Sequence, residues 1–108
     1  MPENSQSILV IFDVDPQENG KTFEIVETSR FEKILKSLKR QKSSLFRNLA
    51  KQLKKISREP YLGKPLRNIL RNRRRIHVGS FVLLYEIYQG KVYLLDFDHH
   101  ERIYKKYE

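Results

Sequence analysis

The chain has 108 residues, of which 39% are hydrophobic, and this is enough for one domain around one hydrophobic core. It contains no cysteine, which excludes disulfide bonds and zinc sites built on thiolates. The formal net charge is +9 but is unevenly spread: residues 1–29 sum to −5, residues 30–75 to +15 and residues 76–108 to −1. Such a basic block indicates a polyanionic partner, either a nucleic acid or an acidic protein, with a solvated helix surface as the alternative.

The start of the chain predicts strands and no targeting segment. The apolar run Ile8 to Phe12 is too short to span a membrane and follows no basic segment, so we expect a soluble cytoplasmic protein. Residues 8–14, ILVIFDV, are β-branched and aromatic and predict a strand. Asn19-Gly20 predicts a turn, and residues 23–28 predict a second strand that pairs with the first as a hairpin.

Two amphipathic helices are predicted next. The first begins at Ser29, which forms a capping box with Glu32, and its apolar face has helical spacing: Phe31, Ile34, Leu35 and Leu38. The second begins at Ser43 or Ser44 and ends at Glu59-Pro60, because the residue before a proline avoids helical geometry. Only a few polar residues join the two helices, so we expect an antiparallel helix hairpin.

The second half of the chain predicts a meander of strands. Residues 61–66 form a loop, and strands follow at 73–78, 81–88 and 91–97, separated by Gly79 and by the two-residue turn Gln89-Gly90. The tail after these strands is either a last short strand or a helical turn. The order of elements predicts an α+β fold in which the helix hairpin packs on one face of an antiparallel sheet, with an extra N-terminal strand.

Four features in this order resemble the RelE/ParE superfamily of toxins from toxin–antitoxin pairs. They are the two helices, the loop EPYLGKPL (59–66), the strand pair RIHVGSFVLLYEI (75–87) and the closing HHERIYK (99–105). The resemblance covers residues 22–106. It implies one RelE-like domain over residues 1–108, in which residues 1–21 are an added strand and turn.

The resemblance also implies an activity. RelE-type toxins enter the ribosomal A site and cut messenger RNA without a metal, as the 2′-hydroxyl attacks the adjacent phosphate, and an antitoxin silences them. We therefore expect a ribosome-dependent mRNA endonuclease whose partners are the ribosome, mRNA and a cognate antitoxin, with no cofactor and no membrane. Two alternatives remain: a non-catalytic ParE-like inhibitor of DNA gyrase, and a plain RNA-binding module that shares only the fold.

The family motifs give the candidate catalytic residues, whose roles are implied by the resemblance. Two basic family positions before Val-Gly fall on Arg75 and His77, which would neutralise phosphate. His100 stands where most members carry an arginine, and Tyr104 matches the closing tyrosine that handles a proton. In an extended tail, Arg102 would share a side with Tyr104. The set is therefore His100, Tyr104, Arg75, His77 and Arg102.

One family position departs from the pattern. Val82 stands where RelE-type nucleases carry an arginine that contacts the reacting phosphate, and Phe81 replaces the tyrosine beside it. We expect Val82 to pack in the core, and its presence favours the non-catalytic alternative. Arg73 and Arg102 are the residues that would replace the missing charge.

A wider set of basic residues is predicted to bind RNA through its phosphates. Its members are Arg71, Arg73, Arg74, Lys64, Arg67, Lys51, Lys54 and Lys55. No metal site is predicted, because adjacent His99 and His100 would point to opposite faces of a strand. Asp96 and Asp98 share one strand face, but two carboxylates alone are weak evidence for a metal.

Overall fold

The computed structural model describes residues 22–41, 43–66 and 73–107. The predicted strand at 8–14 and its turn, and the candidate residues Arg67 and Arg71, lie outside the described residues. Among the described helices, none is both long enough and apolar enough to cross a membrane.

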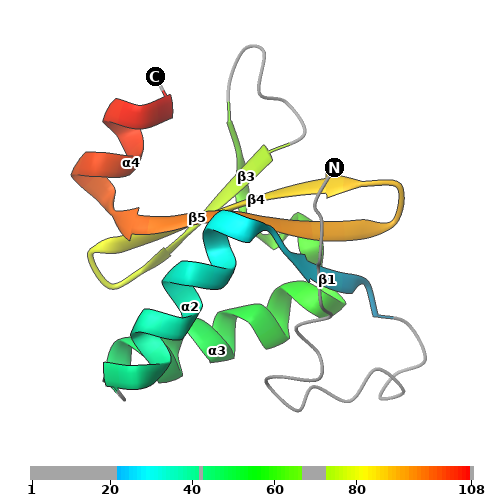
Figure 1. The fold of residues 1–108 in the computed structure, drawn as a ribbon. Coiled ribbons are helices and arrows are strands. Elements are labelled where there is room, and N and C mark those ends of the chain that lie inside the picture. The colour runs from blue at the N-terminus through cyan, green and yellow to red at the C-terminus, as the bar shows by residue number, and fades with distance from the viewer. Residues whose placement is uncertain (1–21, 42, 67–72, 108) are drawn as a thin grey trace.

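The described chain folds as one sheet with helices on both faces (Figure 1). In chain order the elements are β1 (Glu24–Glu27), α2 (Ser29–Gln41), α3 (Ser44–Arg58), η1 (Pro60–Leu62), β2 (Lys64–Pro65), β3 (Arg73–Val78), β4 (Phe81–Tyr88), β5 (Lys91–His99) and α4 (His100–Tyr107). The strand order across the sheet is β1-β5-β4-β3-β2. The predicted α+β class, with a helix hairpin on one face, is confirmed.

The sheet is mixed, whereas the sequence predicted an antiparallel one. β2, β3, β4 and β5 pair antiparallel, but β1 runs parallel to β5, with Ile25 opposite Val92. Parallel neighbours need a long crossover connection. Here the chain from α2 to β4 forms this crossover connection. The pairing therefore joins strands that are far apart in the sequence, and local sequence patterns do not predict it.

The helix boundaries follow side-chain caps. Ser43 caps α3 as predicted, since its hydroxyl accepts a hydrogen bond from the Phe46 N–H at 3.4 Å. The predicted cap of α2 is wrong by one residue: Thr28 holds that place, and its hydroxyl accepts from the Phe31 N–H at 3.4 Å. The same hydroxyl donates to the Leu94 carbonyl at 2.7 Å, which ties the start of α2 to β5. Thr28 therefore both caps α2 and joins its start to the sheet.

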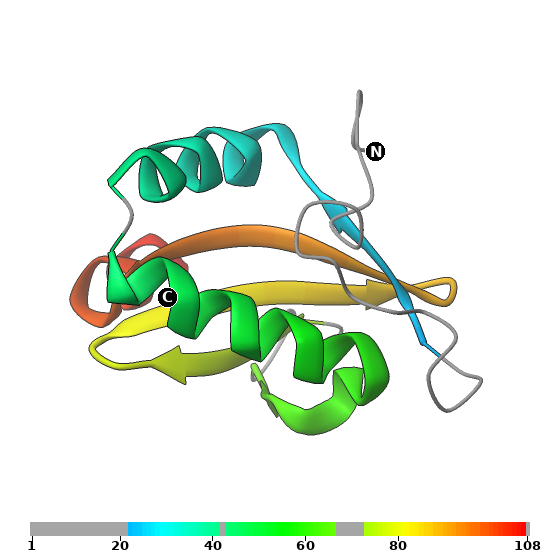
Figure 2. The ribbon, with the colours of Figure 1, turned by 90° about the horizontal axis from the view of Figure 1, so that it is seen from below.

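The main core lies between the sheet and the α2–α3 hairpin, which covers one face (Figure 2). Both helices contribute the apolar stripes that the sequence predicted, and the strands contribute alternate side chains. The fully or nearly fully buried residues of this core are Ile25, Phe31, Leu35, Leu38, Leu49, Leu53, Ile56, Val78, Leu83, Tyr85, Val92, Leu94 and Phe97.

The tail is a helix, which resolves the two alternatives that the sequence left open. α4 begins directly after β5 and lies on the face of the sheet away from α2 and α3 (Figure 1). Val82, Leu84 and Ile103 are buried although they do not belong to the main core cluster. α4 therefore covers part of the second face with its own small apolar contact.

A buried tyrosine fixes the loop between α3 and β3. The Tyr85 hydroxyl donates to the Pro60 carbonyl at 2.7 Å and accepts from the Gly63 N–H at 3.0 Å. A Cβ at Gly63 would lie 2.5 Å from that hydroxyl and 2.8 Å from the Arg75 carbonyl, so only glycine fits there. Burial is the main cause that raises the pKa of Tyr85. This contact therefore joins the loop EPYLGKPL (59–66) to the strand pair RIHVGSFVLLYEI (75–87).

Candidate functional site

Three basic residues of β3 lie on the face of the sheet that carries α4. Ile76 and Val78 pack with the main core, so the alternate residues Arg73, Arg75 and His77 face the other way. Their cross-strand partners on β4 are Glu86, Leu84 and Val82 in turn. Arg73, Arg75 and His77 therefore share one face of the sheet, as side chains at alternate positions of a strand do.

Tyr104 of α4 meets two of these residues. Its hydroxyl lies 3.4 Å from Nε2 of His77, within reach of a hydrogen bond. The Arg75 guanidinium lies 5.8 Å from the centre of the Tyr104 ring, a cation–π distance. The His100 ring centre is 6.4 Å from the same ring. We call Arg75, His77, His100 and Tyr104 the basic–aromatic cluster.

Arg102 lies away from this cluster. The prediction that it shares a side with Tyr104 is wrong, because it held only for an extended tail. Successive helical residues are turned by about 100°, so residues two apart point to nearly opposite sides. Arg102 instead pairs with Asp98 at 3.1 Å, and its side chain is 70% exposed.

The two adjacent histidines lie together. The helix begins at His100, so the strand alternation that would separate the rings ends at His99, and the two rings stack with centres 4.6 Å apart. His99 also packs edge-on against Phe81 at 5.8 Å. Across the described residues, His, Cys, Asp and Glu side chains form no group of three or more that could hold a metal ion.

The arginines of β3 differ in how they are held. Nε of Arg73 pairs with Glu86 at 3.1 Å, which offsets its charge. Arg74, on the core face, donates to the Gly63 carbonyl at 2.6 Å and lies over the Tyr61 ring, so it braces the loop. Nε of Arg75 is buried and has no hydrogen-bond partner in the described structure. Arg75, whose guanidinium lies over the Tyr104 ring, has no carboxylate partner among the described residues.

Val82 is fully buried on the same face. Its neighbours in the sheet are His77 on β3 and Asp98 on β5. The expected burial is confirmed, although Val82 lies on the α4 side of the sheet and not in the main core. A valine at this place supplies no charge to the cluster.

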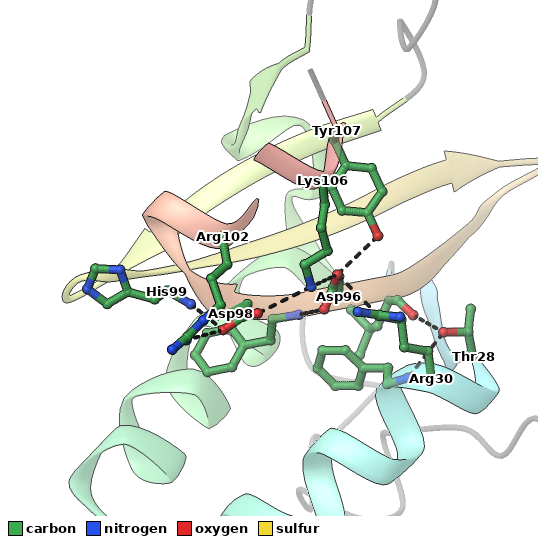
Figure 3. A network of polar contacts seen from close by, with 11 residues as sticks. Thr28, Arg30, Asp96, Asp98, His99, Arg102, Lys106 and Tyr107 are labelled. Carbon is green, nitrogen blue, oxygen red and sulfur yellow. Dashed lines mark hydrogen bonds and ion pairs between the residues drawn. The ribbon is translucent and has the colours of Figure 1, made fainter. Parts of the chain in front are cut away.

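An acidic network beside the cluster fixes α4, and the sequence patterns did not identify it. Asp96 is buried and accepts hydrogen bonds from Lys106 at 2.8 Å and Tyr107 at 3.0 Å, both on α4 (Figure 3). Arg30, at the start of α2, approaches the same carboxylate at 3.2 Å. Lys106 also reaches Asp98 at 3.2 Å. The only signal in the sequence was that Asp96 and Asp98 share a strand face.

Charge and hydrogen bonding control the ionisation of this network. Burial alone would raise the pKa of Asp96, but hydrogen bonds from Lys106 and Tyr107 outweigh it and hold that pKa below its ordinary value. The pKa of Asp98 is also lowered, because hydrogen bonds from the His99 N–H, Lys106 and Arg102 outweigh its burial. The pKa of Lys106 is raised because its carboxylate partners outweigh its own burial. The network is therefore ionised at neutral pH.

Among the described residues, the wider set of predicted RNA-binding residues is divided between the two faces of the sheet. Lys51, Lys54 and Lys55 are exposed on the side of α3 that points away from the sheet, opposite the buried stripe of that helix. α3 covers the face opposite to α4 (Figure 2). Lys64 is exposed on the short edge strand β2 directly opposite Arg75, so its side chain lies on the face of the cluster. The lysines of α3 thus present positive charge on the side of the molecule opposite to the cluster, whereas Lys64 extends the positive charge on the face of the cluster.

Comparison with known proteins gives consistent matches. Residues 25–104 match the family model described as the ParE toxin of the type II toxin–antitoxin system parDE. A Methanocaldococcus jannaschii protein named "Putative toxin RelE4" is 33% identical over 87 residues, which are 78% of this chain and 93% of that protein. The structure resembles a chain of the Mycobacterium tuberculosis toxin–antitoxin complex RelBE2, with a TM-score of 0.57 and 28% identity over 72% of this chain and 98% of that chain.

Proposed function

The chain belongs to the ParE toxin family, within the RelE/ParE superfamily of toxin–antitoxin systems, and from that premise we propose that it is a ribosome-dependent mRNA endonuclease. It acts in the cytoplasm, where translating ribosomes are, and a cognate antitoxin neutralises it. The observation that carries the proposal is the contact between Tyr104 and His77 beside Arg75. The contact joins a proton donor, a titratable base and a permanent cation at one place.

The chemistry assigns a role to three members of the cluster, Arg75, His77 and Tyr104. The 2′-oxygen of a nucleotide attacks the adjacent phosphorus as its P–O5′ bond breaks, which leaves a 2′,3′-cyclic phosphate and a free 5′-hydroxyl. The Arg75 guanidinium offsets the negative charge that builds on the phosphate oxygens. One proton leaves the 2′-hydroxyl and one reaches the 5′-oxygen. The adjoining His77 imidazole and Tyr104 hydroxyl supply a base and an acid for these transfers.

Charge supports the two proposed partners. Residues 30–75 carry a net charge of +15, and Lys51, Lys54, Lys55 and Lys64 are exposed among them. Ribosomal RNA is a polyanion, and neutralising its phosphates releases counterions, so the association weakens steeply as salt rises. The M. tuberculosis relative was solved as a complex with its antitoxin, which supports an antitoxin partner here.

The experiment that tests the proposal is primer extension on an mRNA undergoing translation in a cell-free system. Wild type is compared with Tyr104→Phe and with the matched control Tyr88→Phe, which removes a hydroxyl from an exposed tyrosine of β4 outside the cluster. We expect cuts at A-site codons with wild type and Tyr88→Phe, and a loss of about 100-fold or more with Tyr104→Phe. Absence of ribosome-dependent cuts with wild type would refute the proposal.

A second candidate function is inhibition of DNA gyrase, as in ParE-like toxins. The observation that favours it is the fully buried Val82, which provides no cation where RelE-type nucleases use an arginine. A supercoiling assay with purified gyrase separates the two candidates. Inhibition of supercoiling together with uncut mRNA would select gyrase, whereas neither effect would leave a plain RNA-binding module.

A further inference from the structure

Asp96 is a charged group in a buried position with donors from several directions. Its side chain is 1% exposed, and its Oδ1 accepts from the Phe97 N–H at 2.8 Å. Its Oδ2 faces Lys106, Tyr107 and Arg30 at 2.8, 3.0 and 3.2 Å (Figure 3). Burying a carboxylate is costly unless it is paired and hydrogen-bonded, so these contacts are what make the position tolerable.

Two of these donors come from the last turn of α4. The helix has only eight residues, and a helix of that length is not stable in water by its own hydrogen bonds. Contacts with the sheet must therefore hold it. The buried contacts are Ile103, which is 3% exposed, and the pair Lys106 and Tyr107 on Asp96.

Tyr104 lies between these two attachments in the sequence. It follows Ile103 directly and precedes Lys106 by two residues, so a shift of the short helix moves its ring together with them. At 3.4 Å, its hydroxyl is at the outer limit of a hydrogen bond to His77. A displacement of about 1 Å would break this contact, and positioning errors of that size are costly in enzymes.

We propose that Asp96 is the positioning residue of the site: it holds α4 through Lys106 and Tyr107 so that the Tyr104 hydroxyl meets His77. Its effect on catalysis rests on the proposed function, whereas its effect on the geometry of α4 does not. Asp96 touches neither Tyr104 nor His77 through any hydrogen bond or ion pair in the described structure. It therefore acts through the helix and is not itself a catalytic residue.

The network offers matched variants. Asp96→Asn keeps the size of the side chain but removes its charge. The double variant Lys106→Gln, Tyr107→Phe releases the same attachment from the α4 side and leaves the buried strand residue in place, so it serves if Asp96→Asn fails to fold. Arg30→Gln is the control, because it removes a partner of Asp96 that lies on α2 and is 57% exposed.

The experiment measures amide hydrogen exchange in α4 and the chemical shifts of the His77 ring by NMR, each on the full chain. With Asp96→Asn and with the double variant we expect exchange of the α4 amides to rise by about tenfold or more, with β4 amides unchanged. The chemical shifts of the His77 ring should then move to those of Tyr104→Phe. Arg30→Gln should match wild type in both readouts. Unchanged α4 exchange and unchanged chemical shifts of the His77 ring in the two network variants would overturn the proposal.

The two proposals fail in different ways. If the network variants loosen α4 but wild type cuts no mRNA on ribosomes, the positioning role of Asp96 stands and the endonuclease is refuted. If wild type cuts mRNA and both network variants cut at the wild-type rate, the endonuclease stands and the positioning role is overturned. A loss of cutting that accompanies changed chemical shifts of the His77 ring supports both.

Discussion

The Tyr104 hydroxyl and Nε2 of His77 lie 3.4 Å apart although the two residues are 27 positions apart in the chain. His77 belongs to β3, whereas Tyr104 belongs to the helix that follows β5, and β4 lies between those strands. The tail spans this distance because it turns into a helix at His100 and lies over the sheet. The contact therefore depends on the docking of α4 as much as on the two residues themselves.

Direct contact predicts that Tyr104 and His77 act as a unit. We expect Tyr104→Phe and His77→Gln each to slow ribosome-dependent cleavage by about 100-fold or more, as loss of an acid or base does. The double variant should be only a few-fold slower than either single variant, because residues that work together give non-additive losses. Single-turnover cleavage rates on programmed ribosomes measure this. Multiplied losses in the double variant would show that the two residues act independently.

RelE-type nucleases carry an arginine at the position of Val82. Because Val82 is buried, we predict that introducing this arginine lowers the free energy of unfolding. Val82 is fully buried on the α4 side of the sheet, so Val82→Arg should lower the free energy of unfolding by about 1–3 kcal/mol, because a larger side chain is forced into a packed site even though Asp98 opposite offers a carboxylate. Tyr88→Arg, which adds the same charge at an exposed site of the same strand, should change it little. Urea unfolding of the two variants provides the comparison. A stable Val82→Arg protein that cuts mRNA faster than wild type would contradict this view of the site.

The two hydrogen bonds of the buried Tyr85 hydroxyl predict that it stabilises the loop before β3. Tyr85→Phe removes a hydroxyl that donates to the Pro60 carbonyl and accepts from the Gly63 N–H, and leaves both groups unpaired and buried. We expect a loss of about 1–3 kcal/mol in the free energy of unfolding. Tyr88→Phe, at an exposed position of the same strand, should change it by less than about 0.5 kcal/mol. Equal effects of the two substitutions in thermal unfolding would show that the buried hydroxyl does not hold the loop.

Local patterns predicted most of this fold, and long-range contacts account for what they missed. β3 and β4, and the limits of α3, follow from alternation, turn residues and the Glu59-Pro60 pair, which all act within a few residues. The parallel pairing of β1 with β5 and the choice of Thr28 as a cap depend on partners about 65 residues away. The eight-residue helix α4 is too short to give a clear helical pattern. Because this helix was not predicted, Arg102 was assigned to the site and the contact of Asp96 with α4 was not recognised.

The acidic network predicts a specific loss of stability in acid. The pKa of Asp96 is lowered in the folded protein because donors on α4 outweigh its burial, so the folded state binds its proton less readily than the unfolded chain does. The stabilisation is therefore complete above the ordinary value of 3.8 and is lost as the pH falls through the lowered pKa. We expect the free energy of unfolding of wild type to fall steeply below about pH 4, and that of Asp96→Asn to fall less. Urea unfolding at a series of pH values measures this. The two curves should converge as the pH falls. Curves that stay parallel would mean that the Asp96 carboxylate does not hold α4 in place.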